Sequence, residues 1–257
     1  MPAPRLSVVI PAYNEQGRLG PSLASVLAYA RRAPFDVEIV VVDDGSSDQT
    51  ARVARAALAS WHSSQVLAND RNHGKGYSVR RGALAARGEL LLLSDADLST
   101  PIEETDRLLG RLGEQGGGIV IGSRAVRGAR VEVHQNPVRE AMGKVFNRVV
   151  RLLTGLPFHD TQCGFKLMAR ADVVPLFEAA RIDGFGYDVE LLYVAARKGI
   201  PIREEPVIWR NAPGSKVGIL TDPARMLRDV WRVRQWYARG VYGAAGAGRK
   251  AGAAPDA

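Results

Sequence analysis

The chain has 257 residues, of which 46% are hydrophobic, and its formal net charge is +8. This length allows one large domain with or without a tail. Its single cysteine, Cys163, excludes an internal disulfide and is typical of a reducing compartment. The N-terminus lacks the apolar core of a signal peptide, and no stretch approaches the ~20 apolar residues that span a bilayer. We therefore expect a soluble or peripheral protein.

The positive charge is concentrated in two segments. Residues 123–151 carry a net charge of +5 and residues 221–242 a net charge of +3, while the rest of the chain sums to zero. This clustering indicates anionic partners such as phosphates, lipid headgroups or nucleic acid, although a solvated basic face explains it equally well. Nucleic acid is disfavoured because the basic residues do not alternate with aromatic stacking platforms and no helix-turn-helix or zinc pattern is present.

The first half of the chain alternates apolar strands with helices. In chain order, we expect strands at 6–10, 37–42, 66–67, 89–93 and 119–122, and helices at 18–31, 49–60, 76–87 and 102–113. Continuous apolar strands separated by helices predict an α/β fold, in which a mostly parallel sheet is covered by helices on both faces. Ligands bind such sheets at the carboxyl ends of the strands. The polar clusters at 13–15, 43–45 and 95–97 should therefore converge on one crevice.

The second half shows a different pattern. We expect basic amphipathic helices at 138–153 and 222–241, and a disordered tail rich in glycine and alanine. The chain is accordingly divided into a main domain at 1–220, a basic amphipathic helix at 221–242 and a tail at 243–257.

Asp95-Ala96-Asp97 is the main candidate for a chemical site. Two carboxylates flank one small residue directly after an expected buried strand. Mg²⁺ and Mn²⁺ prefer oxygen ligands and usually bind through one or two carboxylates plus substrate phosphates. A cation held there would neutralise a diphosphate leaving group. Such pairs also cap helices or lie in loops, so the position after a strand is what favours a metal site.

Three other segments follow strands or begin helices. Residues 43–46 (Asp-Asp-Gly-Ser) could accept hydrogen bonds from a nucleobase or ribose, but a strand-to-helix turn with an N-cap explains them as well. Residues 11–15 (Pro-Ala-Tyr-Asn-Glu) offer an aromatic face and an acceptor, or form a loop with a helix-starting glutamate. Residues 72–76 (Asn-His-Gly-Lys-Gly) lack the P-loop pattern, so we predict a tight turn before a helix.

Together, three motifs resemble the family 2 glycosyltransferases of the GT-A fold. They are V-V-I-P-A-Y-N-E at 8–15, V-V-D-D-G-S-S-D-x-T at 41–50 and L-S-D-A-D-L-S-T-P at 93–101. The resemblance spans roughly residues 6–240. It implies an inverting transfer from a nucleotide sugar, with Asp95 and Asp97 at the metal and Asp44 near the base.

Four motifs of the second half resemble the polyprenyl-phosphate branch of this family. They are Gly122-Ser123-Arg124, D-T-Q-C-G-F-K at 160–166, Y-D-V-E-L-L at 187–192 and Gly214-Ser215-Lys216. D-T-Q-C-G-F-K is especially similar to dolichyl-phosphate β-glucosyltransferases, which use UDP-glucose. Dolichyl-phosphate mannosyltransferases share the layout but usually differ at this segment. The eukaryotic glucosyl enzymes carry an N-terminal membrane anchor that is not seen in this sequence.

Carried over by position, the resemblance implies a role for each candidate residue. The residues expected at the nucleotide sugar are Pro11, Tyr13, Glu15, Val42, Asp43, Asp44, Asp95, Ala96, Asp97, Arg124, Arg210 and Lys216. Those expected at the acceptor phosphate are Arg139, Ser215 and Lys216. Those assigned to catalysis are Asp97, Arg124, Asp160, Asp188 and Glu190. The implied cofactor is Mg²⁺ or Mn²⁺ at Asp95 and Asp97.

The chemistry of a phosphate acceptor explains the basic second half. A lipid phosphate is already anionic, so the protein must offset charge repulsion with cations and align the acceptor rather than supply a strong base. A hydroxyl acceptor would need a carboxylate base, for which Asp188 or Glu190 could serve. Both could equally orient a basic side chain, and Asp160 could position the acceptor or a basic side chain. We expect glucose transfer from UDP-glucose to a polyprenyl phosphate. The alternatives are a GDP-mannose-dependent enzyme and a family 2 transferase acting on a non-lipid hydroxyl.

The two basic helices suit a membrane surface, with their apolar faces in the headgroup region. Trp231 and Trp236 strengthen this interpretation for the second helix because indole favours interfaces. Alternatively, both helices pack on the sheet or on a partner subunit. We expect a cytoplasmic protein that is peripheral on the cytoplasmic face of a membrane, and the oligomeric state stays open.

Overall fold

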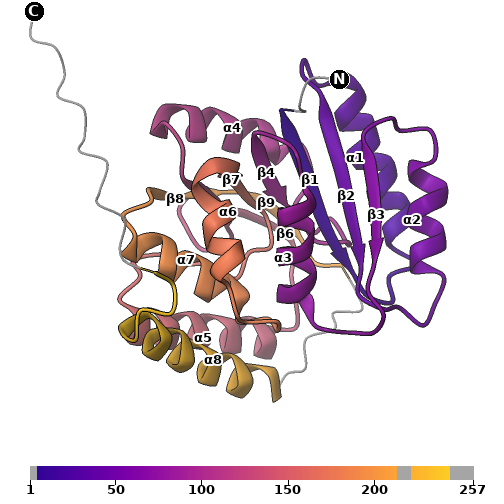
Figure 1. Cartoon of the computed structure of the whole chain (residues 1–257). Coiled ribbons are helices and arrows are strands. Elements are labelled where there is room, and N and C mark those ends of the chain that lie inside the picture. Colours follow the sequence, from indigo (N-terminus) through magenta and orange to yellow (C-terminus); the bar gives the residue numbers. More distant parts are fainter. Residues whose placement is uncertain (1–4, 213–220, 244–257) are drawn as a thin grey trace, which may run out of the picture.

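A computed structural model of the chain describes residues 5–212 and 221–243 (Figure 1). Within these residues the main sheet has seven strands, in the spatial order β3 (Ser64–Ala68), β2 (Val37–Asp43), β1 (Leu6–Ala12), β4 (Leu90–Leu93), β7 (Lys166–Ala169), β5 (Ile119–Ser123) and β8 (Ile202–Pro206). Neighbouring strands are parallel except for β7, which is antiparallel to both β4 and β5. A smaller sheet pairs β6 (Arg130–Val133) with β9 (Ile208–Arg210). This is the mostly parallel α/β fold that the sequence predicts.

Helices cover both faces of the main sheet. One face is covered by α1 (Leu19–Arg32), α2 (Thr50–Leu58) and α4 (Glu104–Gln115). The opposite face is covered by α3 (Lys75–Ala85), α6 (Arg170–Ala179) and α7 (Tyr187–Arg197). Successive residues of β1 serve the two cores in turn, since Val8 and Ile10 belong to the first and Val9 to the second. This alternation follows from the pleat of a strand.

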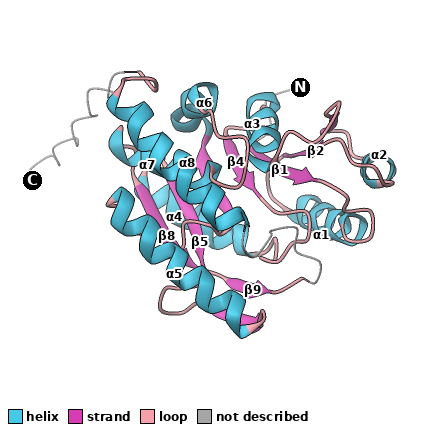
Figure 2. Ribbon diagram, turned by 90° about the horizontal axis from the view of Figure 1, so that it is seen from below, coloured by secondary structure: helices cyan, strands magenta, loops and turns pink. Residues whose placement is uncertain are grey.

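The two basic helices lie side by side at one end of the molecule (Figures 1 and 2). They are α5 (Pro137–Thr154) and α8 (Thr221–Ala238). Both pack on α7 through a small cluster of Val150, Val189 and Val230, one residue from each helix. The described part of α8 also contributes Val233 to the second core. The apolar face of α8 is therefore buried against α7, so the expectation that this face enters the headgroup region is wrong.

The structure differs from the predicted elements mainly after residue 123. The elements that were not predicted are strands β6, β7, β8 and β9 and helices α6 and α7. Every residue from Tyr187 to Ala195 in α7 is buried, because the helix lies between the sheet and the pair α5 and α8. Such a helix has no polar stripe, and periodicity does not reveal it. Pro11, expected to end the first strand, lies inside β1, but pairing with β4 stops at Val9.

Three smaller features complete the description of the fold. Asp48 accepts the N–H of Thr50 at 2.9 Å, which satisfies a donor in the first turn of α2. Cys163 is buried and belongs to the first core. Within the described residues, no helix combines the length and apolar character needed to cross a membrane.

Candidate active site

Two adjoining cavities open at the carboxyl ends of the parallel strands. The first, here called the strand-end cavity, has a volume of about 420 Å³. Its lining includes the expected residues Pro11, Tyr13, Glu15, Asp44, Asp95, Ala96 and Asp97. Three clusters that are far apart in the sequence therefore meet, because parallel strands β1, β2 and β4 end at the same edge.

The second cavity, here called the helix-side cavity, has a volume of about 270 Å³ and reaches α5 and α8. Its lining includes Arg124, Gln162, Asp188 and Trp209 from strands, turns and α7, and Met142 and Met226 from the two basic helices. The residues shared by both cavities are Lys75, Asp95, Asp97 and Phe185. The carboxylate pair thus lies where the two cavities join.

Asp95 is held by a lysine that the sequence analysis missed. Lys75 is the first residue of α3, and its Nζ lies 2.6 Å from Asp95 Oδ1. Burial would raise the pKa of Asp95, but the Lys75 ammonium lowers it below its ordinary value. The other carboxylate oxygen faces Gly164, where a Cβ would lie 2.2 Å from Asp95 Oδ2. Any side chain at 164 would push this carboxylate away, which explains the glycine in D-T-Q-C-G-F-K.

Asp97 has a looser environment. Its Oδ1 accepts the N–H of Ser99 at 3.0 Å, and Arg18 Nη1 lies 3.8 Å from its Oδ2. Burial and the nearby Asp95 carboxylate raise the pKa of Asp97 above its ordinary value.

The donor set of this site fits Mg²⁺ or Mn²⁺. Within the described residues, no group of three or more His, Cys, Asp or Glu side chains could hold a metal ion. Asp95 and Asp97 offer two carboxylates, which would suffice for such a cation when phosphate oxygens of a substrate supply further ligands. That arrangement is the usual one for Mg²⁺.

Asp44 fixes the turn that carries Lys75. Its carboxylate accepts Asn69 Nδ2 at 2.6 Å and the N–H groups of His73 and Gly74 at 3.1 and 2.8 Å. The residue is 3% exposed, so these three donors satisfy most of its acceptor capacity. Asp44 lines the strand-end cavity, but its main task in this structure is to hold residues 69–74.

Two expected contact residues lie away from both cavities. The side chain of Val42 is fully buried in the second core. Asp43 Oδ1 accepts hydrogen bonds from the N–H and the hydroxyl of Ser46, so it closes the strand-to-helix turn. Gly45 belongs to that turn with φ +69°, and a Cβ there would lie 2.3 Å from the Arg71 backbone. The turn interpretation of residues 43–46 therefore describes the Asp43 side chain, which the structure does not bring to either cavity.

Arg124 is the cation best fixed at the helix-side cavity. Its guanidinium donates to both oxygens of Asp160 at 2.7 and 2.8 Å, and its carbon Cζ lies 5.3 Å from the centre of the Trp209 ring. Burial disfavours the charged form, yet the Asp160 carboxylate raises the pKa of Arg124 above its ordinary value. Asp160 is 1% exposed and lines neither cavity. Asp160 thus positions a basic side chain, one of the two roles the sequence left open.

The two α7 carboxylates point to different places. Asp188 lines the helix-side cavity and accepts the ammonium of the fully buried Lys166. Burial raises the pKa of Asp188 and Lys166 opposes this rise. Glu190 lies in another pocket, where its oxygens accept the N–H groups of Arg181 and Ile182. The structural role that the sequence left open fits Glu190, whose side chain lines neither cavity.

The remaining predicted residues stay outside the cavities or outside the described residues. Arg210 is exposed on the small sheet, and its Nε lies 2.7 Å from Glu132 Oε2. It lines neither cavity, so the structure does not bring it together with the other predicted phosphate contacts. The side chain of Arg139, and both Ser215 and Lys216, lie outside the described residues.

Several cavity residues were not predicted. They are Arg18, Lys75, Gln162, Phe185 and Arg225. A lysine between two glycines at a helix start after β3 was the available signal for Lys75. Gln162 stood inside a recognised motif, and its buried Nε2 has no hydrogen-bond partner among the described residues. No local pattern marks Arg18, Phe185 or Arg225.

The family profile described as Glycosyl transferase family 2 matches residues 7–174. The dolichyl-phosphate beta-glucosyltransferase of Homo sapiens is 34% identical over 253 residues, which cover 94% of this chain and 78% of that protein. The enzyme of the same name from Dictyostelium discoideum is 34% identical over 248 residues, covering 92% and 76%. The chain belongs to glycosyltransferase family 2. The family recognised from the sequence is therefore confirmed, and the protein is a glycosyltransferase.

Solved structures share the fold of this transferase. The crystal structure of mannosyl-3-phosphoglycerate synthase from Rubrobacter xylanophilus has a TM-score of 0.68 at 24% identity, covering 92% of this chain and 75% of that one. Glucosyl-3-phosphoglycerate synthase from Mycobacterium tuberculosis, in complex with Mn²⁺ and UDP-glucose, has a TM-score of 0.64 at 19% identity, covering 90% and 79%. The expected GT-A fold is confirmed.

Proposed function

We propose that this transferase moves glucose from UDP-glucose onto a polyprenyl phosphate of the dolichyl type, with inversion at the anomeric carbon. The observation that carries the proposal is the junction of two cavities at Asp95, Asp97 and Lys75. One cavity is formed by strand ends, as nucleotide sites in α/β folds are, and the other extends to two basic helices. The names of the relatives support both the sugar and the acceptor.

The charges around the junction suit a reaction between two anions. Lys75 lies at the carboxylates, and Arg124 lies on the acceptor side of them. Mg²⁺ or Mn²⁺ bound by Asp95 and Asp97 would neutralise negative charge on the leaving diphosphate. Arg124, held in one orientation by Asp160 and Trp209, is placed to receive the acceptor phosphate. Preorganised cations of this kind stabilise the transition state without moving during the reaction.

The surroundings of Asp188 favour a phosphate over a hydroxyl as the acceptor. A hydroxyl acceptor needs a general base that is free to take a proton. Asp188 is buried and already paired with Lys166, while Glu190 is bonded to two backbone N–H groups outside the cavities. The uncommitted amide donor of Gln162 suits an oxygen of the sugar or of the acceptor.

The function is tested by a transfer assay with the purified protein. It is incubated with Mn²⁺ or Mg²⁺, a polyprenyl phosphate and, in separate reactions, labelled UDP-glucose and GDP-mannose. Label from UDP-glucose alone is expected in the organic extract. Extraction of label from GDP-mannose instead would replace the proposed donor. Label that enters only a water-soluble hydroxyl acceptor would overturn the lipid phosphate.

We also propose that α5 and α8 present the surface that contacts the cytoplasmic face of a membrane. Their outer faces carry exposed apolar side chains, namely Val145 and Leu152 on α5 and Trp231 on α8, which are 57%, 85% and 56% exposed. Val145 and Leu152 are seven residues apart and share one face of α5. Arg148 lies between them, and exposed arginines flank Trp231. Apolar side chains among cations suit anionic lipid headgroups.

Removing the exposed apolar side chains should weaken membrane binding. The double change Leu152→Ser and Trp231→Ser is expected to lower partition onto vesicles containing phosphatidylserine about tenfold or more, because each buried side chain contributes about 1.5–3 kcal/mol. Co-sedimentation measures the partition. Leu84→Ser, at a 39% exposed site on α3, is the matched control and should change nothing. Equal binding of the double variant and the wild type would show that another surface meets the membrane.

A further inference from the structure

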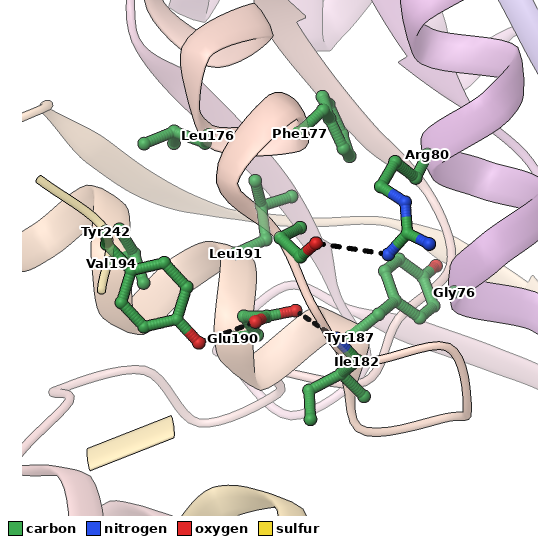
Figure 3. Close-up of a pocket in the computed structure, with 11 residues that line it drawn as sticks. Gly76, Arg80, Leu176, Phe177, Ile182, Tyr187, Glu190, Leu191, Val194 and Tyr242 are labelled. Atoms are coloured by element: carbon green, nitrogen blue, oxygen red, sulfur yellow. Dashed lines mark hydrogen bonds between the residues drawn. The ribbon is translucent and has the colours of Figure 1, made fainter. Parts of the chain in front are cut away.

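Glu190 lines a third, smaller pocket, together with Arg80, Ile182 and Tyr242. Figure 3 shows its carboxylate between Tyr242 and the backbone of Ile182. Oε1 accepts the Tyr242 hydroxyl at 2.6 Å and the N–H of Arg181 at 2.9 Å, and Oε2 accepts the N–H of Ile182 at 2.9 Å. The residue is 1% exposed. Three donors from two distant segments therefore converge on one buried carboxylate.

The first of these segments, residues 180–184, connects α6 to α7. Besides Glu190, its backbone is held by Arg80 of α3, whose Nη1 donates to the carbonyl of Ala180 at 3.2 Å (Figure 3). Arg80 Nη2 also lies 2.7 Å from Asp183 Oδ1. The segment is thus tied on one side to α7 and on the other side to α3.

Residues 180–184 in turn pack against the start of α3. The carbonyl of Asp183 accepts the N–H of Tyr77 at 3.1 Å. A Cβ on Gly74 would lie 2.4 Å from that same oxygen, and a Cβ on Gly76 would lie 2.4 Å from the carbonyl of Ile182. There is therefore no space for a side chain at either position, and the backbone at the start of α3 lies directly against residues 182 and 183. Lys75, between the two glycines, is the residue whose ammonium reaches Asp95.

We propose that Glu190 and Tyr242 form a positioning pair that sets the Lys75 ammonium at the junction of the two cavities. Glu190 fixes the backbone of residues 181 and 182 by hydrogen bonds. The segment 180–184 packs against the glycines on both sides of Lys75, and Lys75 then faces Asp95 and the diphosphate. Glu190 is a positioning residue because it touches neither cavity. The inference rests on the proposed function only in giving Lys75 a diphosphate to contact.

The pair also connects the end of the described chain to the site. Tyr242 follows α8. Among the hydrogen-bond donors to Glu190 within the described residues, its hydroxyl is the only one that comes from beyond α7. The turn after α8 therefore takes part in positioning Lys75. Helix α8 would thus both contact the membrane through its outer face and, through the turn that follows it, help to position Lys75.

A double-mutant cycle tests the proposal. Binding of UDP in the presence of Mn²⁺ is measured by calorimetry for the wild type, Glu190→Gln, Lys75→Met and the combined variant. Glutamine turns an NH₂ group toward a backbone N–H, so Glu190→Gln should weaken UDP binding about tenfold, in line with one lost charged contact. Because the effect acts through Lys75, the same change should cost less than about twofold in the Lys75→Met background. Additive losses would overturn the proposal.

Controls separate positioning from general damage. Glu205→Gln alters another buried glutamate, paired with Arg111 on the far side of the sheet, and should leave UDP binding unchanged. Should Glu190→Gln not fold, Tyr242→Phe replaces it in the cycle and removes one hydrogen bond; unchanged UDP affinity in that variant would contradict the pair. If the wild type binds GDP rather than UDP, the proposed donor fails, and the cycle is run with GDP.

Discussion

Replacing Asp97 with alanine is expected to lower kcat/KM about 10³-fold or more while the protein stays folded. The variant removes one of two carboxylates proposed to hold the cation that neutralises the leaving diphosphate, and losses of this size follow removal of one preorganised electrostatic contact. The fold should tolerate the change, because Asp97 makes one backbone hydrogen bond to Ser99 and lies next to the like charge of Asp95. Initial rates at saturating Mn²⁺ and a thermal unfolding curve measure the two effects.

The matched control for this prediction is Glu103→Ala. Glu103 is an exposed carboxylate whose Oε1 lies 2.9 Å from Arg32 Nη2, away from both cavities. Surface pairs of this kind contribute little to stability, so both rate and melting temperature should stay at the wild-type values. Metal-dependent turnover of Asp97→Ala near that of the wild type would remove Asp97 from the metal site.

Replacing Asp160 with alanine is expected to lower both stability and activity. The change leaves the Arg124 guanidinium without its carboxylate and removes the acceptor for the Arg124 N–H. Breaking a buried pair costs about 3–5 kcal/mol, and the lower end applies because Arg124 is 29% exposed and can reach water. At 257 residues this corresponds to a fall of about 10 °C in melting temperature. A released Arg124 no longer points at the acceptor, so kcat/KM should fall about 10²-fold.

Two further variants distinguish the causes of these losses. The double variant Arg124→Ala, Asp160→Ala should be more stable than Arg124→Ala alone, because it leaves no unpaired buried carboxylate, yet it should be no more active. Glu38→Ala breaks another buried carboxylate–arginine pair, with Arg87, far from both cavities. It should lower the melting temperature and leave kcat/KM within about twofold. Normal activity of Asp160→Ala would show that Arg124 needs no orienting partner.

The local sequence pattern was sufficient to predict the elements in the first half of the chain and the residues at one edge of the site. Strands β1, β2, β4 and β5 are short apolar runs that end at Gly, Pro, Asp or Ser, and such runs can be recognised from the sequence. Because parallel strands end at a common edge, the meeting of Tyr13, Asp44, Asp95 and Asp97 followed from the order of the elements. The motifs added the family, which the comparisons confirmed.

The tertiary structure decided which polar side chains face the cavities and which hold the fold. Asp43 is the last residue of β2 and Asp44 follows it, but the side chain of Asp43 closes a turn while Asp44 lines the strand-end cavity. Asp188 and Glu190 lie 200° apart around α7, so one lines a cavity and the other holds residues 181 and 182. Lys75 reaches Asp95 because the start of α3 lies close to the residues that follow β4.

The amino-acid sequence by itself determined the parallel sheet, its acidic edge and the family, since each depends on periodicity or on short contiguous motifs. Only the tertiary structure decided the partners of Lys75, Arg124 and Glu190, the antiparallel insertion of β7, and the burial of the apolar face of α8. Those features depend on contacts between segments tens of residues apart. The sequence specifies which side chains are present, whereas tertiary packing determines which residues each of them contacts.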